Sequence, residues 1–198
     1  MFLNLDKCRK CVKEGGGCCD GEDSGIFCTL HDALRISKAT GMNIEKIVTF
    51  GKVAESFIQS MKEQDNEFYE IYVNDRVLQL KRKRKHCQFL TPKGCSIIGS
   101  RPLLCRLFPF SYDEDDSGNL IVTLPKTDNR EDEDCTICSD NFGANIDVAL
   151  KDMAADKNAM LKLIMQSMKE LEIYEEYAPL IAEGKSYEEI IEQFKIKV

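Results

Sequence analysis

The spacing of apolar residues predicts three helices in the first third of the chain. Thr29 precedes apolar residues at helical spacing in the segment 30–39, and Gly41 follows them. Threonine favours the start of a helix because its hydroxyl accepts a backbone N–H, and glycine favours the end because it adopts left-handed backbone angles. We therefore expect a first helix between Thr29 and Gly41, followed by helices over 43–48 and 53–63.

The central third has the alternating, β-branched pattern of short strands. Strands are predicted over 68–73 and 77–80, and hairpins over 87–98 and 110–124, where turn residues interrupt the apolar runs. A short helix is expected over 100–107, because a proline near its start fits the first helical turn. This mixture predicts an α+β fold, with a small Cys-rich domain of short helices and β-hairpins.

Toward the C-terminus cysteine is absent and helical spacing returns. One long helix is predicted over 146–171, a short one over 174–182, and a last one that Ser186 caps. We accordingly predict a cysteine-cluster metal-binding domain at 1–142 and an α-helical C-terminal extension at 143–198.

Composition narrows the class of protein. The 198 residues are 43% hydrophobic, which supplies a sizeable core. No apolar run reaches the roughly 20 residues of a membrane-spanning helix. The formal net charge of −7 disfavours nucleic acid as a partner, because phosphate binding needs a basic face. The first residues, Met1–Cys8, do not have the pattern of a signal peptide, so we expect a cytoplasmic protein whose thiols stay reduced.

The unusual feature of the composition is ten cysteines against two histidines. Two pairs, Cys8–Cys11 and Cys135–Cys138, have Cys-x2-Cys spacing, which lets two thiolates point at one metal ion. All-thiolate sites select zinc or iron–sulfur clusters, and the residues do not discriminate between the two. Cys28 is left open between a ligand and a small buried apolar residue. The other cysteines are the predicted metal ligands: Cys8, Cys11, Cys18, Cys19, Cys87, Cys95, Cys105, Cys135 and Cys138.

Several of these cysteines lie in strings that resemble a known family. The first four are followed by Thr29-Leu30-His31-Asp32, by Cys87 and Cys95, and by Arg101-Pro102-Leu103-Leu104-Cys105-Arg106-Leu107-Phe108-Pro109. Over about half of the chain, residues 8–110, these strings resemble the YkgJ-like, or CxxCxxCC, cysteine-cluster proteins, described as zinc- or iron-chelating domains. The resemblance implies a metal centre built by Cys8, Cys11, Cys18, Cys19, Cys87, Cys95 and Cys105.

The chain departs from the family pattern between Cys11 and Cys18. Six residues separate them, where the family name implies about two, and a Gly triplet fills the gap. The Cys135–Cys138 pair lies beyond the matching strings.

Charged residues flank two of the predicted ligands. Arg101 and Arg106 lie on either side of Cys105, where we expect them to support cofactor binding by offsetting thiolate charge. The basic run 81–86 leads into Cys87. Its pattern is typical of a solvated loop, and the alternatives are binding of nucleic acid, of an acidic partner, or of the chain's own acidic loop, Asp128–Asp134.

Three functional interpretations stay open. The first is a metal-binding protein whose centre is structural or carries metal or electrons. The second follows from the resemblance, since the family includes a domain of flagellin lysine methylases, thought to be iron–sulfur proteins that use S-adenosylmethionine. The third is a module that binds a protein partner through the C-terminal helices while the metal holds the fold. No catalytic motif is recognised, so the sequence leaves open whether the protein is an enzyme.

Overall fold

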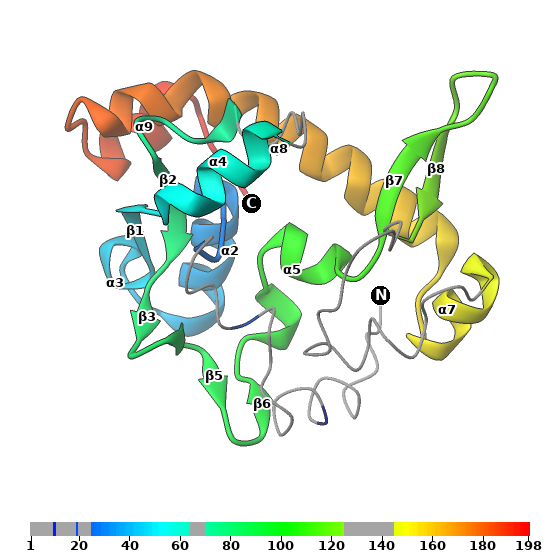
Figure 1. Ribbon diagram of the computed structural model, residues 1–198. Coiled ribbons are helices and arrows are strands. Elements are labelled where there is room, and N and C mark those ends of the chain that lie inside the picture. Colours follow the sequence, from blue (N-terminus) through cyan, green and yellow to red (C-terminus); the bar gives the residue numbers. More distant parts are fainter. Residues whose placement is uncertain (1–9, 11–18, 20–24, 64–69, 125–144) are drawn as a thin grey trace. The chain divides into compact units, whose positions relative to one another are not determined.

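The computed structural model describes Lys10, Cys19 and residues 25–63, 70–124 and 145–198, and it confirms an α+β fold (Figure 1). The helices in these residues are α2 (Leu30–Thr40), α3 (Ile44–Ile47), α4 (Glu55–Glu63), the 3-10 helix η3 (Ile98–Ser100), α5 (Leu103–Leu107), α7 (Ile146–Asp152), α8 (Lys157–Ala182) and α9 (Tyr187–Gln193). The strands are β1 (Val48–Lys52), β2 (Arg76–Leu80), β3 (Arg82–Lys83), β4 (His86–Cys87), β5 (Leu90–Thr91), β6 (Gly94–Cys95), β7 (Ser111–Glu114) and β8 (Leu120–Thr123). Within the described residues each strand pairs antiparallel with one neighbour, in the order β1–β2, β3–β4, β5–β6 and β7–β8.

Helix α2 begins and ends where the sequence predicts. The Thr29 hydroxyl accepts a hydrogen bond from the backbone N–H of Asp32, and the Asp32 carboxylate accepts one from the backbone N–H of Thr29, both at 3.1 Å. Gly41 ends the helix in the left-handed region at a φ of 71°. These reciprocal bonds satisfy N–H groups that the first helical turn leaves without partners.

Two predictions for the strands were wrong. Val48, expected at the end of a helix, instead opens β1, because the backbone of β1 pairs with β2 in the register Val48↔Leu80. The predicted strand 68–73 is not formed in its described part. Glu70 and Ile71 form a 3-10 turn there, and Val73 makes only an isolated bridge.

The long helix predicted over 146–171 is divided, and the predicted break after it is absent. Helix α7 ends at Asp152 and α8 begins at Lys157. Between them Ala154 has a φ of 51°, a left-handed angle that an α-helix cannot contain. Helix α8 then runs without interruption to Ala182.

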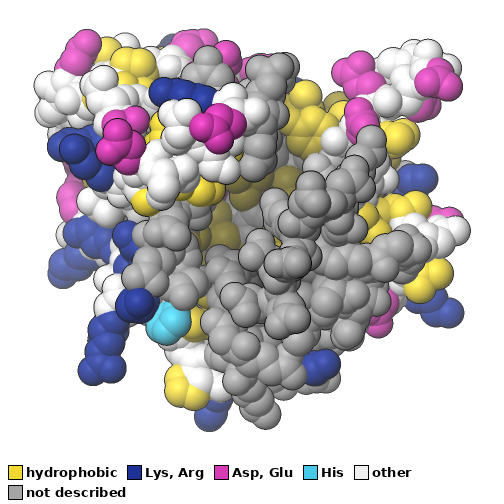
Figure 2. All heavy atoms as spheres, viewed as in Figure 1, with side chains coloured by type: hydrophobic (Ala, Val, Ile, Leu, Met, Phe, Trp, Pro, Cys, Tyr) yellow, Lys and Arg dark blue, Asp and Glu magenta, His cyan; other side chains and the backbone are white. Residues whose placement is uncertain are grey.

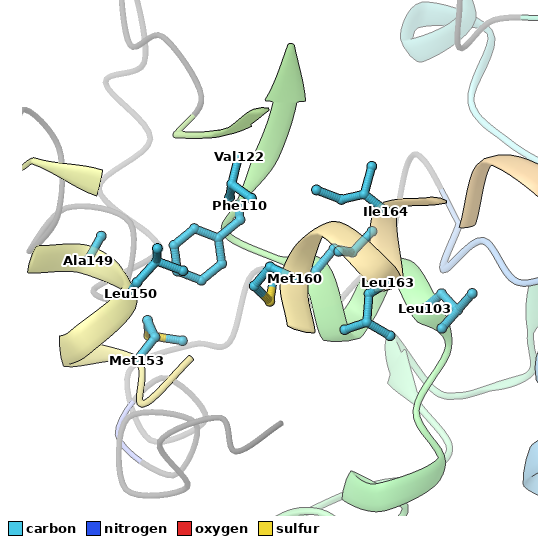
Figure 3. Close-up of a cluster of buried hydrophobic side chains, with 10 residues drawn as sticks. Leu103, Phe110, Val122, Ala149, Leu150, Met153, Met160, Leu163 and Ile164 are labelled. Atoms are coloured by element: carbon cyan, nitrogen blue, oxygen red, sulfur yellow. The ribbon is translucent and has the colours of Figure 1, made fainter. Parts of the chain in front are cut away.

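The chain forms two compact units, and each is discontinuous in sequence. The first comprises Met1–Cys18, Leu90–Ser96 and Leu103–Ser167. Its core joins α5, the β7–β8 hairpin, α7 and the start of α8, as Figure 3 shows. The buried side chains are Leu103, Leu107, Phe110, Val122, Ala149, Leu150, Met153, Met160, Leu163 and Ile164.

The second unit comprises Cys19–Phe89, Ile97–Pro102 and Met168–Val198. Two fully buried tyrosines of α8 form hydrogen bonds with other elements of this second unit. The Tyr177 hydroxyl accepts from the backbone N–H of Leu30 at 2.7 Å, and the Tyr174 hydroxyl accepts from that of Leu78 at 3.2 Å. The last part of α8 is therefore tied to the start of α2 and to β2. The domain boundary predicted near residue 143 stays a prediction.

Candidate metal centre

Cys28 lies in the core of the second unit. Its side chain is fully buried, and its backbone N–H donates to the carbonyl of Leu78 at 3.0 Å. The neighbouring Phe27 ring packs edge-to-face on Tyr174, with ring centroids 4.9 Å apart. These surroundings favour the second of the two interpretations that the sequence left open, a small buried apolar residue, and the role of Cys28 stays a prediction.

Four of the predicted ligands are described, and they lie on short elements. Cys87 is in β4, Cys95 in β6 and Cys105 in α5, elements of 2, 2 and 5 residues. Cys19 lies in a 3-10 turn. Cys87 is buried, and the other three are partly exposed. No disulfide joins any two of the five cysteines that the structure describes.

The described residues do not by themselves assemble a metal site. Among them, no group of three or more His, Cys, Asp or Glu side chains is placed to hold a metal ion. The remaining predicted ligands, Cys8, Cys11, Cys18, Cys135 and Cys138, lie outside the described residues. The fit of a metal therefore rests on the chemistry of the donors, since thiolates suit zinc and iron.

The elements that carry Cys87 and Cys95 have little stability of their own. Each belongs to a hairpin whose strands pair over only two residues. An isolated two-stranded hairpin is marginally stable in water, so such short ones need further support. Metal ligation supplies that kind of support in small metal-binding domains, where binding free energy becomes folding free energy.

The two predicted arginines differ in their surroundings. Arg101 follows η3 and is buried, with 8% of its surface exposed, whereas Arg106 lies in the last turn of α5 and is partly exposed. A guanidinium as buried as that of Arg101 is costly unless charged or polar groups compensate it. The role of either arginine in offsetting thiolate charge stays a prediction.

Sequence reasoning missed a buried ion network in the second unit. Arg35 of α2 donates two hydrogen bonds to the carboxylate of Glu170 of α8, each 2.7 Å long, and a further one to Asp32. The Thr29 hydroxyl donates to Glu170 at 3.2 Å. Asp32 and Glu170 are both buried. The i,i+3 spacing of Asp32 and Arg35 in a helix was a sequence signal for the contact between them. Glu170 lies 135 residues from Arg35, and no sequence signal indicated that contact.

Burial sets the protonation behaviour around this network. Desolvation raises the pKa of the Asp32 carboxyl, and the charge and hydrogen bond of Arg35 oppose that rise. Desolvation also lowers the pKa of His31, against an opposing effect of the Glu170 charge. The buried Nδ1 of His31 makes no hydrogen bond within the described part of the chain. Within the described residues, the network joins the partly buried cation of Arg35 to the two buried carboxylates of Asp32 and Glu170.

The fold and the thiol chemistry together define an α+β protein with a cysteine cluster suited to zinc or iron. In agreement with this class, residues 7–139 match the family model CxxCxxCC, "Putative zinc- or iron-chelating domain". The chain belongs to this family. The match extends past the strings recognised in the sequence and includes Cys135 and Cys138. Searches of the curated proteins and of the solved structures found no match. In the described residues, no helix is both long enough and apolar enough to cross a membrane.

Proposed function

We propose that this protein binds zinc or an iron–sulfur cluster through its cysteine cluster and that Cys28 is not a ligand. The proposed ligands are the nine cysteines that the sequence singled out. One observation carries the proposal: Cys87, Cys95 and Cys105 lie on elements of two to five residues, whereas the Cys28 side chain is fully buried in a core that includes aromatic rings. The family membership supports zinc or iron as the metal.

The proposal assigns the metal a structural role in the segment from β4 to α5. In this segment the strands pair over only two residues, and the side chains of Phe89, Ile97, Leu103 and Leu107 are buried. A metal bound through Cys87, Cys95 and Cys105 would fix it at three points. Zinc would supply this constraint alone, and an iron–sulfur cluster would add the capacity to carry electrons.

The test is the metal content of the full chain purified without oxygen. We expect stoichiometric zinc, or iron together with acid-labile sulfide and a brown chromophore. A reversible redox couple in the second case would give the centre an electron-carrying role. If neither metal is present and reconstitution with zinc or with iron and sulfide fails, the proposal is overturned.

Cysteine variants test the ligand assignment. Cys105→Ser should lose most of the bound metal, because serine does not replace a thiolate on a soft metal site. Cys28→Ala is the matched control, since it removes a thiol that the structure places in the core. It should keep wild-type metal content per folded molecule, at a cost in stability of about 1 kcal/mol from the lost packing. Equal metal loss in both variants would show that Cys28 belongs to the site.

A further inference from the structure

The β3–β4 hairpin carries five consecutive cations, Lys81–Lys85, and all five are exposed. Figure 2 shows Lys and Arg side chains gathered at the lower left, over the part of the molecule that β3 occupies in Figure 1. This concentration contrasts with the net charge of −7 of the whole chain. Neighbouring like charges repel one another, so this run concentrates positive charge at a cost in electrostatic free energy.

The backbone holds this hairpin in a fixed position in the second unit. At its base the backbone N–H of Lys81 donates to the carbonyl of Ile47 at 2.8 Å, and that of Gln88 donates to Lys81 at 3.1 Å. The Gln88 side-chain amide also donates to the carbonyls of Ile47 at 2.9 Å and Lys46 at 3.0 Å. Exposed Lys46 therefore adds a sixth cation at the base. The result is a basic platform that is anchored at its base, which reduces the backbone entropy lost on binding.

The size and composition of the platform favour an acidic polypeptide over nucleic acid. Its strands are two residues long, and residues 81–88 contain no Phe, Tyr or Trp on which a base could stack. A nucleic acid would also extend beyond the hairpin onto a protein with excess negative charge. A short run of carboxylates needs only the local charge, and the planar guanidinium groups of Arg82 and Arg84 pair well with carboxylates.

We propose that the β3–β4 hairpin is a docking surface for an acidic segment of a partner protein. The hairpin ends in Cys87, which pairs with Arg82 across the two strands. A segment bound here would lie beside one of the proposed metal ligands. That Cys87 is a metal ligand rests on the proposed function, whereas docking of an acidic segment on the hairpin does not. The docking proposal and the proposed function can therefore fail separately.

The test measures binding of a fluorescein-labelled oligo-glutamate peptide to the full chain, purified as it carries its metal, by anisotropy at low salt. The variant is Lys83→Glu/Lys85→Glu. The control is Lys162→Glu/Lys169→Glu, which changes the net charge equally at two exposed positions of α8. We expect affinity to fall about tenfold or more in the hairpin variant and to stay within about twofold in the control. Binding should also weaken as salt is raised to about 0.5 M, because exposed charges are screened.

Three results would overturn the proposal. These are no binding of the peptide to the wild-type chain at low salt, equal losses in the two variants, and tighter hairpin-dependent binding of labelled single-stranded RNA than of the peptide. Metal content is measured in parallel. If the charge-reversed variant loses metal or fails to fold, Lys83→Gln/Lys85→Gln replaces it, with the same direction of effect expected at about threefold.

Discussion

Replacing Arg35 with methionine tests the buried network most directly. Methionine keeps much of the volume of the arginine stem but removes the cation that bonds both Asp32 and Glu170. The side chain of Arg35 is 16% exposed, and those of Asp32 and Glu170 are 3% and 7% exposed, so the two carboxylates would be left desolvated. Removing one partner of a buried ion pair costs about 3–5 kcal/mol. Because Arg35 keeps some contact with water, we expect the lower end of that range, about 3 kcal/mol.

The assay is urea unfolding of the full chain followed by circular dichroism. Arg76→Met is the matched control, since Arg76 is exposed at the start of β2, and it should change stability by no more than about 0.5 kcal/mol. A cost below about 1 kcal/mol for Arg35→Met would refute the reasoning, since it would mean that the three charges behave as solvated surface groups.

The cost of Arg35→Met should depend on pH. Burial already raises the pKa of the Asp32 carboxyl in the folded protein, and loss of Arg35 removes the charge that opposes this rise. A raised folded-state pKa gives a contribution to stability that is present at low pH and lost as pH rises through the folded value. The penalty of the variant should therefore shrink between pH 7 and about pH 5. A penalty that grows over this interval would contradict the assignment.

Two further predictions concern partly buried positions of the second unit. Gly51→Ala would place a Cβ atom 2.5 Å from the amide nitrogen of buried Gln79, so we expect a loss of about 1–3 kcal/mol in urea unfolding, whereas Gly99→Ala meets open space and should be nearly neutral. His31 should titrate below the ordinary histidine pKa of about 6.5. Its contribution to stability is then present above that pH and lost as pH falls through the folded value. NMR of the ring protons tests this, with His31→Gln identifying the signal; a midpoint at or above pH 6.5 would be inconsistent with burial.

The sequence predicts local structure well where one residue decides it. The Thr29 cap with Asp32, the Ser186 cap with Glu189 and the left-handed Gly41 are each visible as short patterns and are each present. The prediction fails where a distant segment decides. Val48 belongs to a strand only because β2, almost thirty residues later, pairs with it. The division of α7 from α8 has the same character, because no Pro or Gly marks Ala154 as a break.

In the candidate site, too, some features have a signal in a short stretch of sequence and others depend on distant segments. Cysteine spacing is a local signal, and it led to the family and to zinc or iron as the metal. The proposed exclusion of Cys28 from the site has no local signal, because it depends on the burial of Cys28 beside residues of β2 and α8. The partner of Arg35 is equally invisible, since Glu170 sits in a helix whose sequence carries many other charges.

The segment after residue 143 contains no cysteine, so its chemistry differs from that of the preceding part of the chain. The packing of its longest helix, α8, affects how the C-terminal helices should be tested for a partner. Glu170, Tyr174 and Tyr177 bind α2 and β2 through buried side chains. Deleting 146–198 would remove these contacts and expose the core of the second unit, so loss of a partner in that variant would report unfolding. Surface variants of α8 avoid this. Met165 is 52% exposed, so Met165→Gln leaves the buried contacts intact. A partner that binds through this helix should lose affinity for the variant, while unfolding by urea stays unchanged within about 0.5 kcal/mol.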